Sequence, residues 1–369
     1  MYEYDRRIVL TLDAGGTNFV FGAVQSCEEI TEPYRLPSVP NDLNRCIQNL
    51  VDGFNAVKNQ LSEDPVAISF AFPGPADYEH GVIGDLPNFP AFRGGIALGP
   101  YLAHQFGIPV YINNDGNLFA YGEALAGTLP QINKELQEAG SQKQYHNLLG
   151  LTLGTGFGAG VVINDDILLT GDNGCGGDIW CMRNLKYPDL IVEESVSIRA
   201  VMRVFRELGG DPDPSLTPKD LYQIAEYSTD TTQQQAAKES FRELGRMAGA
   251  SIANALMMVD GMVVFGGGIA NNHRYIMPGV MEELRATLGT FGGDRFPCLQ
   301  MSVYNLLEDA DRKIFFQDNT RQVNIPGILK YVPYSCDRKI GVTISKMGTS
   351  RAIQLGAYAY ALTQLDKKQ

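Results

Sequence analysis

The chain has 369 residues, of which 44% are hydrophobic, so it is long enough to bury the cores of two ordinary domains. Its formal net charge of −12 disfavours both nucleic acid and anionic membranes as partners. Six scattered cysteines, and the lack of an apolar run of the roughly 20 residues that a bilayer requires, predict a soluble protein of the reducing cytoplasm.

Two stretches of the sequence are similar to each other, at residues 10–24 and 151–163. Each predicts a strand, a glycine-rich turn and a second strand. Because the two stretches are much farther apart than the units of a solenoid, they indicate two related domains rather than a repeat array.

The segments between these stretches alternate helices and strands. Apolar residues at helical spacing predict a helix over 43–61, and a buried strand follows over 65–72. A short strand at 109–112 leads into a helix that ends at Leu125. The polar segment 130–147 predicts a surface excursion rather than an element of the core.

The second half of the chain contains further apolar periodicity. It predicts helices over 198–208, 241–259 and 349–365. A strand over 262–265 runs into the glycines at 266–268, and residues 291–340 have an irregular pattern.

The first glycine turn is suited to hold phosphate groups. Gly15 and Gly16 let backbone N–H groups approach phosphate oxygens, and Thr17 and Asn18 add side-chain donors. Asp13, at the end of its strand, can orient the waters of a bound Mg²⁺. The alternative is a tight hairpin whose glycines serve only turn geometry, which is the favoured interpretation of any one such turn taken alone.

The other two glycine turns strengthen the nucleotide interpretation by their combination with the first. Their candidate cofactor-binding residues are Gly154, Thr155, Gly156, Gly158, Gly266, Gly267 and Gly268. Three such turns and a strand-end aspartate, in this order, are rarely assembled by an unrelated α/β protein.

Asp115 is the candidate catalytic base. It follows a predicted strand and lies at or near a helix N-terminus, where a carboxylate is kept ionised and can accept the proton of an attacking hydroxyl. The alternative is that Asn114 and Asp115 only cap the helix. Both roles can coexist, with Asn114 binding sugar hydroxyls and Asp115 acting as the base.

In chain order, these segments resemble the motifs of the ROK family of sugar kinases and repressors. Segments similar to its phosphate, catalytic, second phosphate and adenosine motifs lie at 13–17, 114–117, 153–160 and 263–269. Further similar segments lie at 73–77, 86–90 and 348–362. The resemblance runs from about residue 8 to 362, with apparent insertions near 130–147 and 293–340.

The resemblance implies an α/β protein with a duplicated actin-like ATPase (ribonuclease H-like) fold, its two domains flanking a cleft. The expected domains are 1–125 completed by 346–369, and 126–345. The resemblance further implies ATP and Mg²⁺ as cofactors, a hexose or N-acetylhexosamine as the substrate, and a homodimer.

The resemblance also implies sugar contacts. Asn88 and Asn114 match two family positions, and Glu193, aligned through Ser197 and Arg199, matches a third. Where family kinases carry Glu-x-Gly-His, this chain has Asp178-Ile179-Trp180-Cys181, so Asp178 is a shorter substrate-binding carboxylate and the sugar stays open.

The same segment departs from the family's zinc site. Cys175 and Cys181 lack the spacing of zinc ligands and a neighbouring histidine, so no structural zinc is expected and both thiols are predicted to be buried. Trp180 either stacks on a sugar or fills the core, and packing is the favoured interpretation.

Two functions other than an active kinase stay open. One is a degenerate protein that binds sugar and nucleotide without transfer. The other is a family regulator without a DNA-binding module; it is disfavoured by the negative charge and by a first strand that begins near residue 8.

Overall fold

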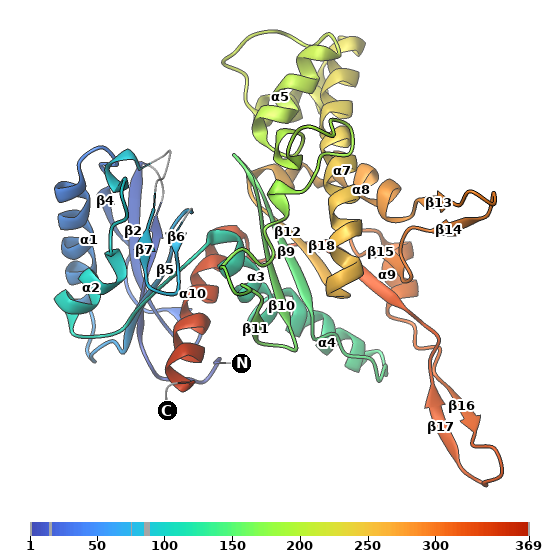
Figure 1. The fold of residues 1–369 in the computed structure, drawn as a ribbon, viewed down its shortest axis with the longest axis horizontal. Coiled ribbons are helices and arrows are strands. Elements are labelled where there is room, and N and C mark those ends of the chain that lie inside the picture. Colours follow the sequence, from blue (N-terminus) through green and yellow to red (C-terminus); the bar gives the residue numbers. More distant parts are fainter. Residues whose placement is uncertain (1, 15–16, 75, 85–88, 368–369) are drawn as a thin grey trace. The chain divides into compact units, whose positions relative to one another are not determined.

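The computed structural model describes residues 2–14, 17–74, 76–84 and 89–367 (Figure 1). The chain forms two compact units. Unit 1 comprises Met1–Thr128, Ala159–Gly177 and Ser345–Gln369, and unit 2 comprises Leu129–Gly158 and Asp178–Ile344. Both contain helices and strands, so the predicted α/β class is confirmed. In the described part of the chain, no helix is long and apolar enough to cross a membrane.

The first sheet and its helices alternate along the first third of the chain, and the last helix returns to them. The elements are β1 (Val9–Ala14), β2 (Asn18–Gln25), β3 (Glu28–Glu29), β4 (Tyr34–Pro37), α1 (Leu43–Lys58), β5 (Ala67–Ala71), β6 (Ala76–Asp77), β7 (Val82–Ile83), α2 (Leu98–Phe106), β8 (Val110–Asn113), α3 (Asp115–Leu125) and α10 (Thr349–Asp366).

The rest of the chain contains the second sheet, longer helices and two separate hairpins. The elements are α4 (Thr128–Glu138), β9 (Leu148–Leu153), β10 (Phe157–Ile163), β11 (Ile167–Leu168), α5 (Ile198–Glu207), α6 (Pro218–Tyr227), α7 (Thr231–Val259), β12 (Met262–Gly266), α8 (His273–Leu284), β13 (Thr287–Gly289), β14 (Arg295–Pro297), β15 (Ser302–Asn305), α9 (Asp309–Phe315), β16 (Arg321–Asn324), β17 (Tyr331–Tyr334) and β18 (Lys339–Ile344). Short 3₁₀ turns lie at Pro90–Phe92, Ile179–Cys181, Val192–Glu194 and Gly268–Asn272.

Five strands of each six-stranded sheet follow a matching order, and the sixth strand, β4 or β15, is placed differently. The first has the order β3-β2-β1-β5-β8, with β4 also paired to β2, and the second has the order β11-β10-β9-β12-β18-β15. In each, the first strand of a glycine hairpin, β1 or β9, lies between its hairpin partner and a parallel strand, β5 or β12. This matching order supports the prediction of two related halves.

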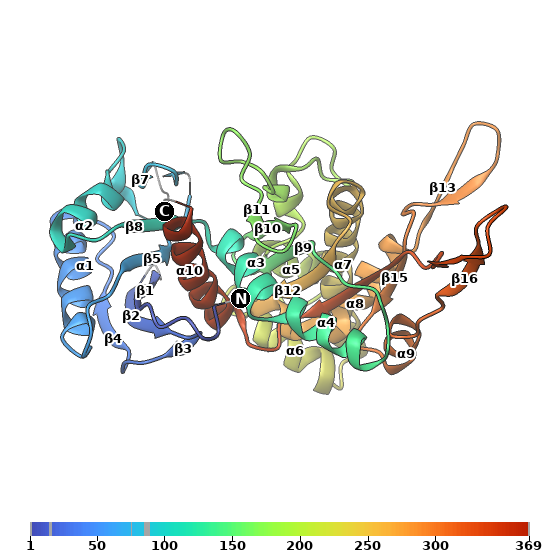
Figure 2. The same ribbon diagram turned by 90° about the horizontal axis from the view of Figure 1, so that it is seen from below.

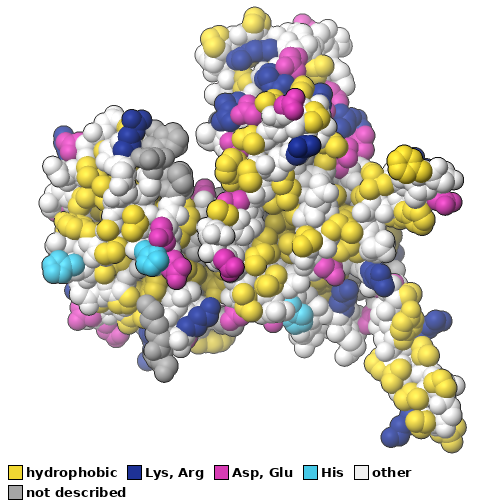
Figure 3. Space-filling model, in the orientation of Figure 1, with side chains coloured by type: hydrophobic (Ala, Val, Ile, Leu, Met, Phe, Trp, Pro, Cys, Tyr) yellow, Lys and Arg dark blue, Asp and Glu magenta, His cyan; other side chains and the backbone are white. Residues whose placement is uncertain are grey.

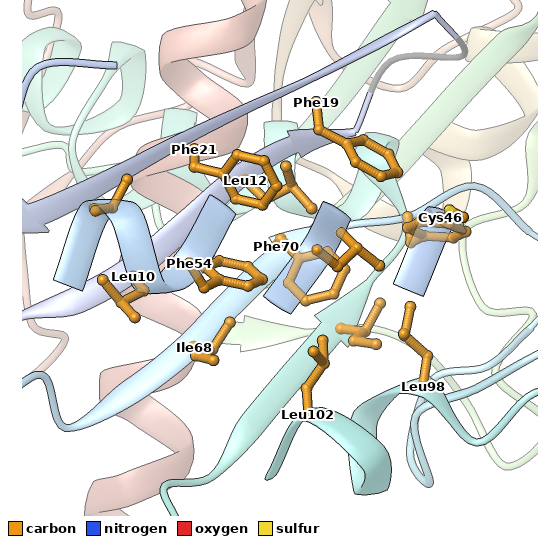
Figure 4. Close-up of a cluster of buried hydrophobic side chains, with 14 of the residues drawn as sticks. Leu10, Leu12, Phe19, Phe21, Cys46, Phe54, Ile68, Phe70, Leu98 and Leu102 are labelled. Atoms are coloured by element: carbon orange, nitrogen blue, oxygen red, sulfur yellow. The ribbon is translucent and has the colours of Figure 1, made fainter. Parts of the chain in front are cut away.

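Helices cover both faces of the first sheet. Figures 1 and 2 show α1 and α2 on one face and α10 on the other. Because side chains alternate along a strand, Leu10 and Leu12 of β1 face the α1 side, and Val9 packs with Tyr358 of α10. On the α1 side the core is rich in phenylalanine, and Figure 4 shows side chains from both layers pointing toward one another.

Glycines let α3 and α10 approach each other closely. A Cβ added at Gly122 would lie 1.9 Å from the carbonyl oxygen of Ala352, and one added at Gly356 would lie 1.9 Å from that of Leu118. Real Cβ atoms do not approach backbone oxygens this closely, so any larger residue would force the two helices apart. This crossing fixes the end of the chain on unit 1, a position that periodicity alone does not give.

One sequence prediction of structure is wrong. The segment 130–147 was expected to be a surface excursion, but it begins with α4, whose Leu129, Ile132 and Leu136 are buried. These apolar residues recur at helical spacing, and the polar residues between them obscure the pattern. By contrast, the predicted helices at 43–61, 115–125, 198–208, 241–259 and 349–365 are confirmed.

Candidate functional site

Candidate residues of unit 1 gather at one edge of its sheet. Strands β1, β5 and β8 run parallel, and their register places Leu12, Phe70 and Ile112 in one row. Asp13, next to last in β1, and Asn113, last in β8, therefore lie at the same edge, roughly 10 Å apart across two strand spacings. Ligands commonly bind at the carboxyl edge of such a sheet.

The first glycine turn lies only partly within the described residues. Asp13, Thr17 and Asn18 are exposed around it, whereas Gly15 and Gly16 lie outside the described part of the chain. Another predicted residue outside it is the sugar-contact candidate Asn88.

Asp13 fits a water-mediated Mg²⁺ contact. It lines a pocket of about 450 Å³ and is open to solvent. Within residues 2–14, 17–74, 76–84 and 89–367, no group of three or more His, Cys, Asp or Glu side chains is arranged to hold a metal ion. Mg²⁺ keeps several waters and is commonly held by one or two carboxylates together with substrate phosphates, so a single carboxylate such as that of Asp13 suits this kind of site.

The capping alternative is confirmed for Asn114. Its side-chain oxygen accepts a hydrogen bond from the Gly116 N–H at 2.8 Å, which makes it the N-cap of α3. Asp115 is the first residue of the helix, and its Oδ1 accepts from the same N–H at 2.9 Å. The side-chain oxygen of Asn113 stabilises the same turn by accepting a hydrogen bond from the Asn114 N–H at 2.8 Å. The side chain of Asn114 thus provides the cap, and Asp115 occupies the first turn of the helix.

The side chain of Asp115 is exposed to solvent but is also surrounded by protein atoms. Water reaches the carboxylate, but surrounding protein atoms partly desolvate it and so raise its pKa above the usual aspartate value. The hydrogen bond from the Gly116 N–H acts in the opposite direction and lowers this pKa.

The start of α3 lies directly against β10. A Cβ at Gly116 would be 2.6 Å from the Ala159 carbonyl oxygen, and one at Gly160 would be 2.7 Å from the Asn117 Cα. Glycines at both positions let the two backbones touch. Within unit 1, the first turn of α3 is therefore packed against the part of β10 that begins at Ala159.

Within unit 2, the side chain of Glu193 is hydrogen-bonded to the second glycine turn. Its Oε2 accepts a hydrogen bond from the Phe157 N–H at 3.0 Å, and a Cβ at Gly156 would lie 2.6 Å from the same oxygen. No described atom would lie within 4 Å of a Cβ at Gly154, so this part of the turn is open. The predicted sugar-contact carboxylate is therefore joined to the predicted phosphate turn.

Arg199 also contacts the second glycine turn, a role that the sequence did not predict. Its guanidinium donates to the Thr155 carbonyl at 3.4 Å and to a carboxylate oxygen of Glu194 at 3.0 Å, and it lies 3.5 Å from Glu193 Oε1. The only sequence signal for this role is the position of the arginine in the first turn of α5.

The third glycine turn packs on the end of β9. Strand β12 ends at Gly266, which pairs with Thr152. Gly267 has φ of +91°, and a Cβ there would lie 2.1 Å from the Leu153 carbonyl oxygen. A Cβ at Gly268 would meet no described atom within 4 Å. The end of β9 and the turn that follows it, which continues through Gly158, are thus the part of unit 2 that Glu193, Arg199 and Gly267 all contact.

The segment that departs from the family motif lies beside Glu193. The 3₁₀ turns Ile179–Cys181 and Val192–Glu194 are linked by a hydrogen bond of 2.8 Å from the Val192 N–H to the Met182 carbonyl. Asp178 begins this segment, and partial desolvation raises its pKa, whereas the Trp180 side chain acts to lower it.

Two predictions about this segment are wrong. Trp180 was expected to fill the core, but 40% of it is exposed, and Cys175 and Cys181 are exposed rather than buried. The reason is that residues 171–178 form turns without a strand or helix, and of the three residues in the following 3₁₀ turn only Ile179 is buried.

Comparisons with known proteins agree on one family. The ROK family model matches residues 9–293. A crystal structure of a glucokinase from Parabacteroides distasonis is 54% identical, covers 98% of this chain and 99% of that one, and superposes with a TM-score of 0.89.

Curated relatives match over shorter stretches. A glucokinase of Thermotoga maritima is 30% identical over 172 residues, which are 46% of this chain and 49% of that protein. An N-acetyl-D-glucosamine kinase of Vibrio cholerae is 30% identical over 171 residues, 46% of this chain and 51% of that protein. The chain therefore spans about half the length of these two relatives.

Proposed function

The chain belongs to the ROK family and has its duplicated actin-like ATPase fold, and from this premise we propose that it is a sugar kinase that phosphorylates a hydroxyl of a hexose or N-acetylhexosamine with ATP. The similar protein of known structure from Parabacteroides distasonis is a glucokinase, and the matched Vibrio cholerae protein acts on N-acetyl-D-glucosamine. These names make glucose and N-acetyl-D-glucosamine the first two acceptors to test.

The observation that carries the proposal is the position of Asp115. The carboxylate stands at the N-terminus of α3, on the sheet edge where β1 also ends, and α3 touches the strand that leaves the second glycine turn. A base in this position stands at the carboxyl edge of the sheet, where ligands of parallel α/β sheets commonly bind.

The proposed reaction needs one proton acceptor and charge stabilisation. The sugar oxygen forms a bond to the γ-phosphorus of ATP as its proton passes to Asp115, and the bond between that phosphorus and the β–γ bridging oxygen breaks, releasing ADP. Backbone N–H groups of the turns then stabilise charge on the transferred phosphoryl group. Mg²⁺, held through water by Asp13, would neutralise further negative charge on the phosphates.

Each remaining candidate residue takes a proposed role. Nucleotide phosphates are assigned to Gly15, Gly16, Thr17, Asn18, Gly154, Thr155, Gly156 and Gly158, and the adenosine to Gly266, Gly267 and Gly268. Sugar hydroxyls are assigned to Asn88, Asn114, Asp178 and Glu193. Because Glu193 also holds the Phe157 N–H, it would link sugar binding to the phosphate turn.

The cellular setting is also proposed. All six cysteines are free thiols, which supports a reducing cytoplasm. We further propose that the protein acts on small molecules rather than nucleic acid or membranes, and that it forms a homodimer.

An ADP-release assay tests the proposed activity. The purified protein would be mixed with ATP, Mg²⁺ and, separately, glucose, N-acetyl-D-glucosamine and their epimers. We expect at least one sugar to accelerate ADP release well above the sugar-free rate. If none does while ATP still binds, the degenerate binding protein becomes the better description.

The pH dependence follows from the environment of Asp115. A general base must be ionised, and desolvation raises the pKa of this carboxyl above the usual aspartate value. We therefore expect kcat/KM to fall on the acid side with an apparent pKa above that ordinary value. A pH–rate profile checks this, and a flat profile down to the ordinary aspartate pKa would contradict it.

Sugar binding should be visible through Trp180, the only tryptophan in the chain. Since 40% of it is exposed, in a segment hydrogen-bonded to the 3₁₀ turn that carries Glu193, we expect a saturable change in tryptophan emission on titration with the accepted sugar. Trp180→Ala should raise the KM for sugar by about 3–10-fold, the scale of one lost aromatic contact, and leave the KM for ATP unchanged.

Trp180→Phe is the matched variant, because it keeps a flat apolar ring and should restore most of the sugar affinity. Unchanged emission at saturating sugar, together with an unchanged KM in Trp180→Ala, would exclude this residue from the acceptor site.

A further inference from the structure

Two segments that appear as insertions in the sequence, near 130–147 and 293–340, meet in unit 2. The hydroxyl of Tyr145 in the first donates a hydrogen bond of 2.6 Å to the carbonyl of Lys339 in the second. In Figure 3, Lys and Arg side chains lie where the projecting β16–β17 hairpin joins the rest of unit 2. Two cavities lie at this junction.

The two cavities adjoin each other. The larger has a volume of about 300 Å³ and the smaller about 220 Å³, and Lys143 and Lys339 line both. The larger is at the low end of the volumes of small-molecule sites, roughly 300–1,000 Å³. The stacked rings of Tyr145 and Phe315, with centroids 5.6 Å apart, form its apolar side. Polar groups of the same lining come from Ser141, Asp318, Thr320 and Ser335.

These cavities lie at the edge of the second sheet that is opposite the glycine turns. Strands β9, β12, β15 and β18 are parallel, and residues of the cavities stand just before their first residues, namely Tyr145, Asp260, Met301 and Arg338. The second and third glycine turns lie at the carboxyl ends of β9 and β12, strands of six and five residues. The two edges are therefore roughly 15–20 Å apart, so the cavities are separate from the candidate residues of these turns.

The smaller cavity is rich in positive charge. Among the described residues, Lys143, Arg338 and Lys339 line it with one carboxylate, that of Asp260, in a chain of net charge −12. The ammonium group of Lys339 already donates to two backbone carbonyls, at 2.8 and 3.0 Å, and pairs with Asp337. Lys143 and Arg338 are therefore the cations that a ligand can reach.

Neither of these two cations has a strong partner. Lys143 Nζ lies 3.5 Å from the Asp337 carbonyl oxygen, near the outer limit of a hydrogen bond, and 5.0 Å from the centre of the Tyr145 ring. Desolvation lowers the pKa of Lys143, and the carboxylates of Asp260 and Asp337 act in the opposite direction. Arg338 is exposed, and its guanidinium forms no ion pair within the described part of the chain. A bound anion would supply the missing opposite charge to both.

The two cavities together suit a ligand with one anionic end and one hydroxyl-rich end. A guanidinium and an ammonium beside each other match the oxygens of a phosphate group. In the larger cavity, hydrogen bonds from Thr320 hold the pKa of Asp318 below the usual aspartate value, so this carboxylate is an ionised acceptor for hydroxyl groups. The hydroxyl of Ser335 can both donate to and accept from a sugar.

We propose that these adjoining cavities form a second ligand site, which binds a sugar phosphate apart from the candidate active site. The phosphate group lies between Lys143 and Arg338, and the sugar hydroxyls are bound by Asp318 and Ser335. The inference rests on the proposed function only for the choice of hexose phosphates as probes, since the cavities and their charges belong to unit 2 alone.

Isothermal titration calorimetry of the full-length protein tests this site. Glucose and a non-hydrolysable ATP analogue are kept saturating, so that the candidate active site is occupied, and glucose 6-phosphate is titrated; the experiment is repeated with N-acetyl-D-glucosamine and its 6-phosphate. We expect one molecule of at least one ester to bind per chain, at least 10-fold more tightly than inorganic phosphate, which cannot reach the larger cavity. Absence of binding by both esters, or equal affinity for inorganic phosphate, would overturn the proposal.

Variants of the two reachable cations locate the bound ester. Lys143→Met and Arg338→Gln should each weaken its binding at least 10-fold, the scale of one charge-assisted hydrogen bond. Lys134→Met is the matched control, because the Lys134 side chain is 75% exposed on α4 and lines neither cavity, and its affinity should stay within about 2-fold of the wild type. An ester that binds both cavity variants as tightly as the wild type lies elsewhere, which would refute the site.

The same variants separate this proposal from the kinase activity. Neither Lys143 nor Arg338 belongs to the candidate active site, so ADP release without added sugar phosphate should match the wild type in both. A failure to bind the ester thus leaves the proposed activity in place, and a failure to release ADP leaves the binding site in place.

Discussion

Asp115→Asn is expected to lower kcat by about 10²–10⁴-fold, the range that general-base catalysis contributes. The amide has nearly the shape of the carboxylate but cannot take a proton from the sugar hydroxyl. Since Asn114 provides the cap of α3, the helix start should keep its geometry. Steady-state kinetics with the accepted sugar, together with the affinity for a fluorescent ATP analogue, would measure the effect, and the nucleotide affinity should change little.

Folding stability separates a catalytic loss from a structural one. The pKa of Asp115 is raised in the fold, so the folded state disfavours the ionised form. The stability that this group contributes is fully present below its ordinary pKa and is lost as pH rises through the raised value. At neutral pH the neutral Asn variant should thus be at least as stable as the wild type. A destabilised variant, or one with unchanged kcat, would contradict the assignment of the base.

Gly267→Ala is expected to destabilise unit 2 by about 2–5 kcal/mol, the sum of a strained backbone and an overpacked contact. The residue has φ of +91°, which a residue with a Cβ rarely adopts, and the new atom would lie 2.1 Å from the Leu153 carbonyl oxygen. Because Leu153 immediately precedes the second glycine turn, the displaced strand would also disturb that turn. Urea unfolding followed by circular dichroism measures the loss.

Gly268→Ala is the adjacent control. A Cβ at this position would meet no described atom within 4 Å, so the free energy of unfolding should stay within about 1 kcal/mol of the wild type. If the third turn holds the adenosine, the same methyl group should raise the KM for ATP. Equal destabilisation by both substitutions would mean that the turn is packed differently from the structure described.

Much of the fold follows from local patterns. Apolar periodicity predicts α1, α5 and α10, and the two strand–glycine–strand stretches predict the hairpins that begin each sheet. These signals are strong because one face of each element is buried. The close packing of α10 on α3 was not predictable from local patterns. It depends on a contact between Gly122 and Gly356, which are 234 residues apart in the sequence.

The sequence predicts which segments contribute to the candidate site, but it does not predict the contacts that their side chains make. Each glycine turn is visible in the sequence, and so is Asp115. The hydrogen bond from the Phe157 N–H to Glu193 and the role of Arg199 depend on how a loop folds back on a hairpin, which spacing alone does not determine.

The errors have physical causes too. Segment 128–138 has few apolar residues, but Leu129, Ile132 and Leu136 all lie on its buried face. Trp180 and Cys181 are apolar or weakly polar, and composition favours burial for such residues, yet the short 3₁₀ turn that carries them is too small to bury every side chain.

Phosphorus NMR of ATP, Mg²⁺ and glucose or N-acetyl-D-glucosamine with the wild-type protein follows the phosphoryl transfer itself. We expect the γ-phosphate signal of ATP to disappear while a sugar phosphomonoester and ADP appear in equal amounts. ATP that remains intact with every sugar, or that yields only free orthophosphate, would contradict a sugar kinase built around Asp115.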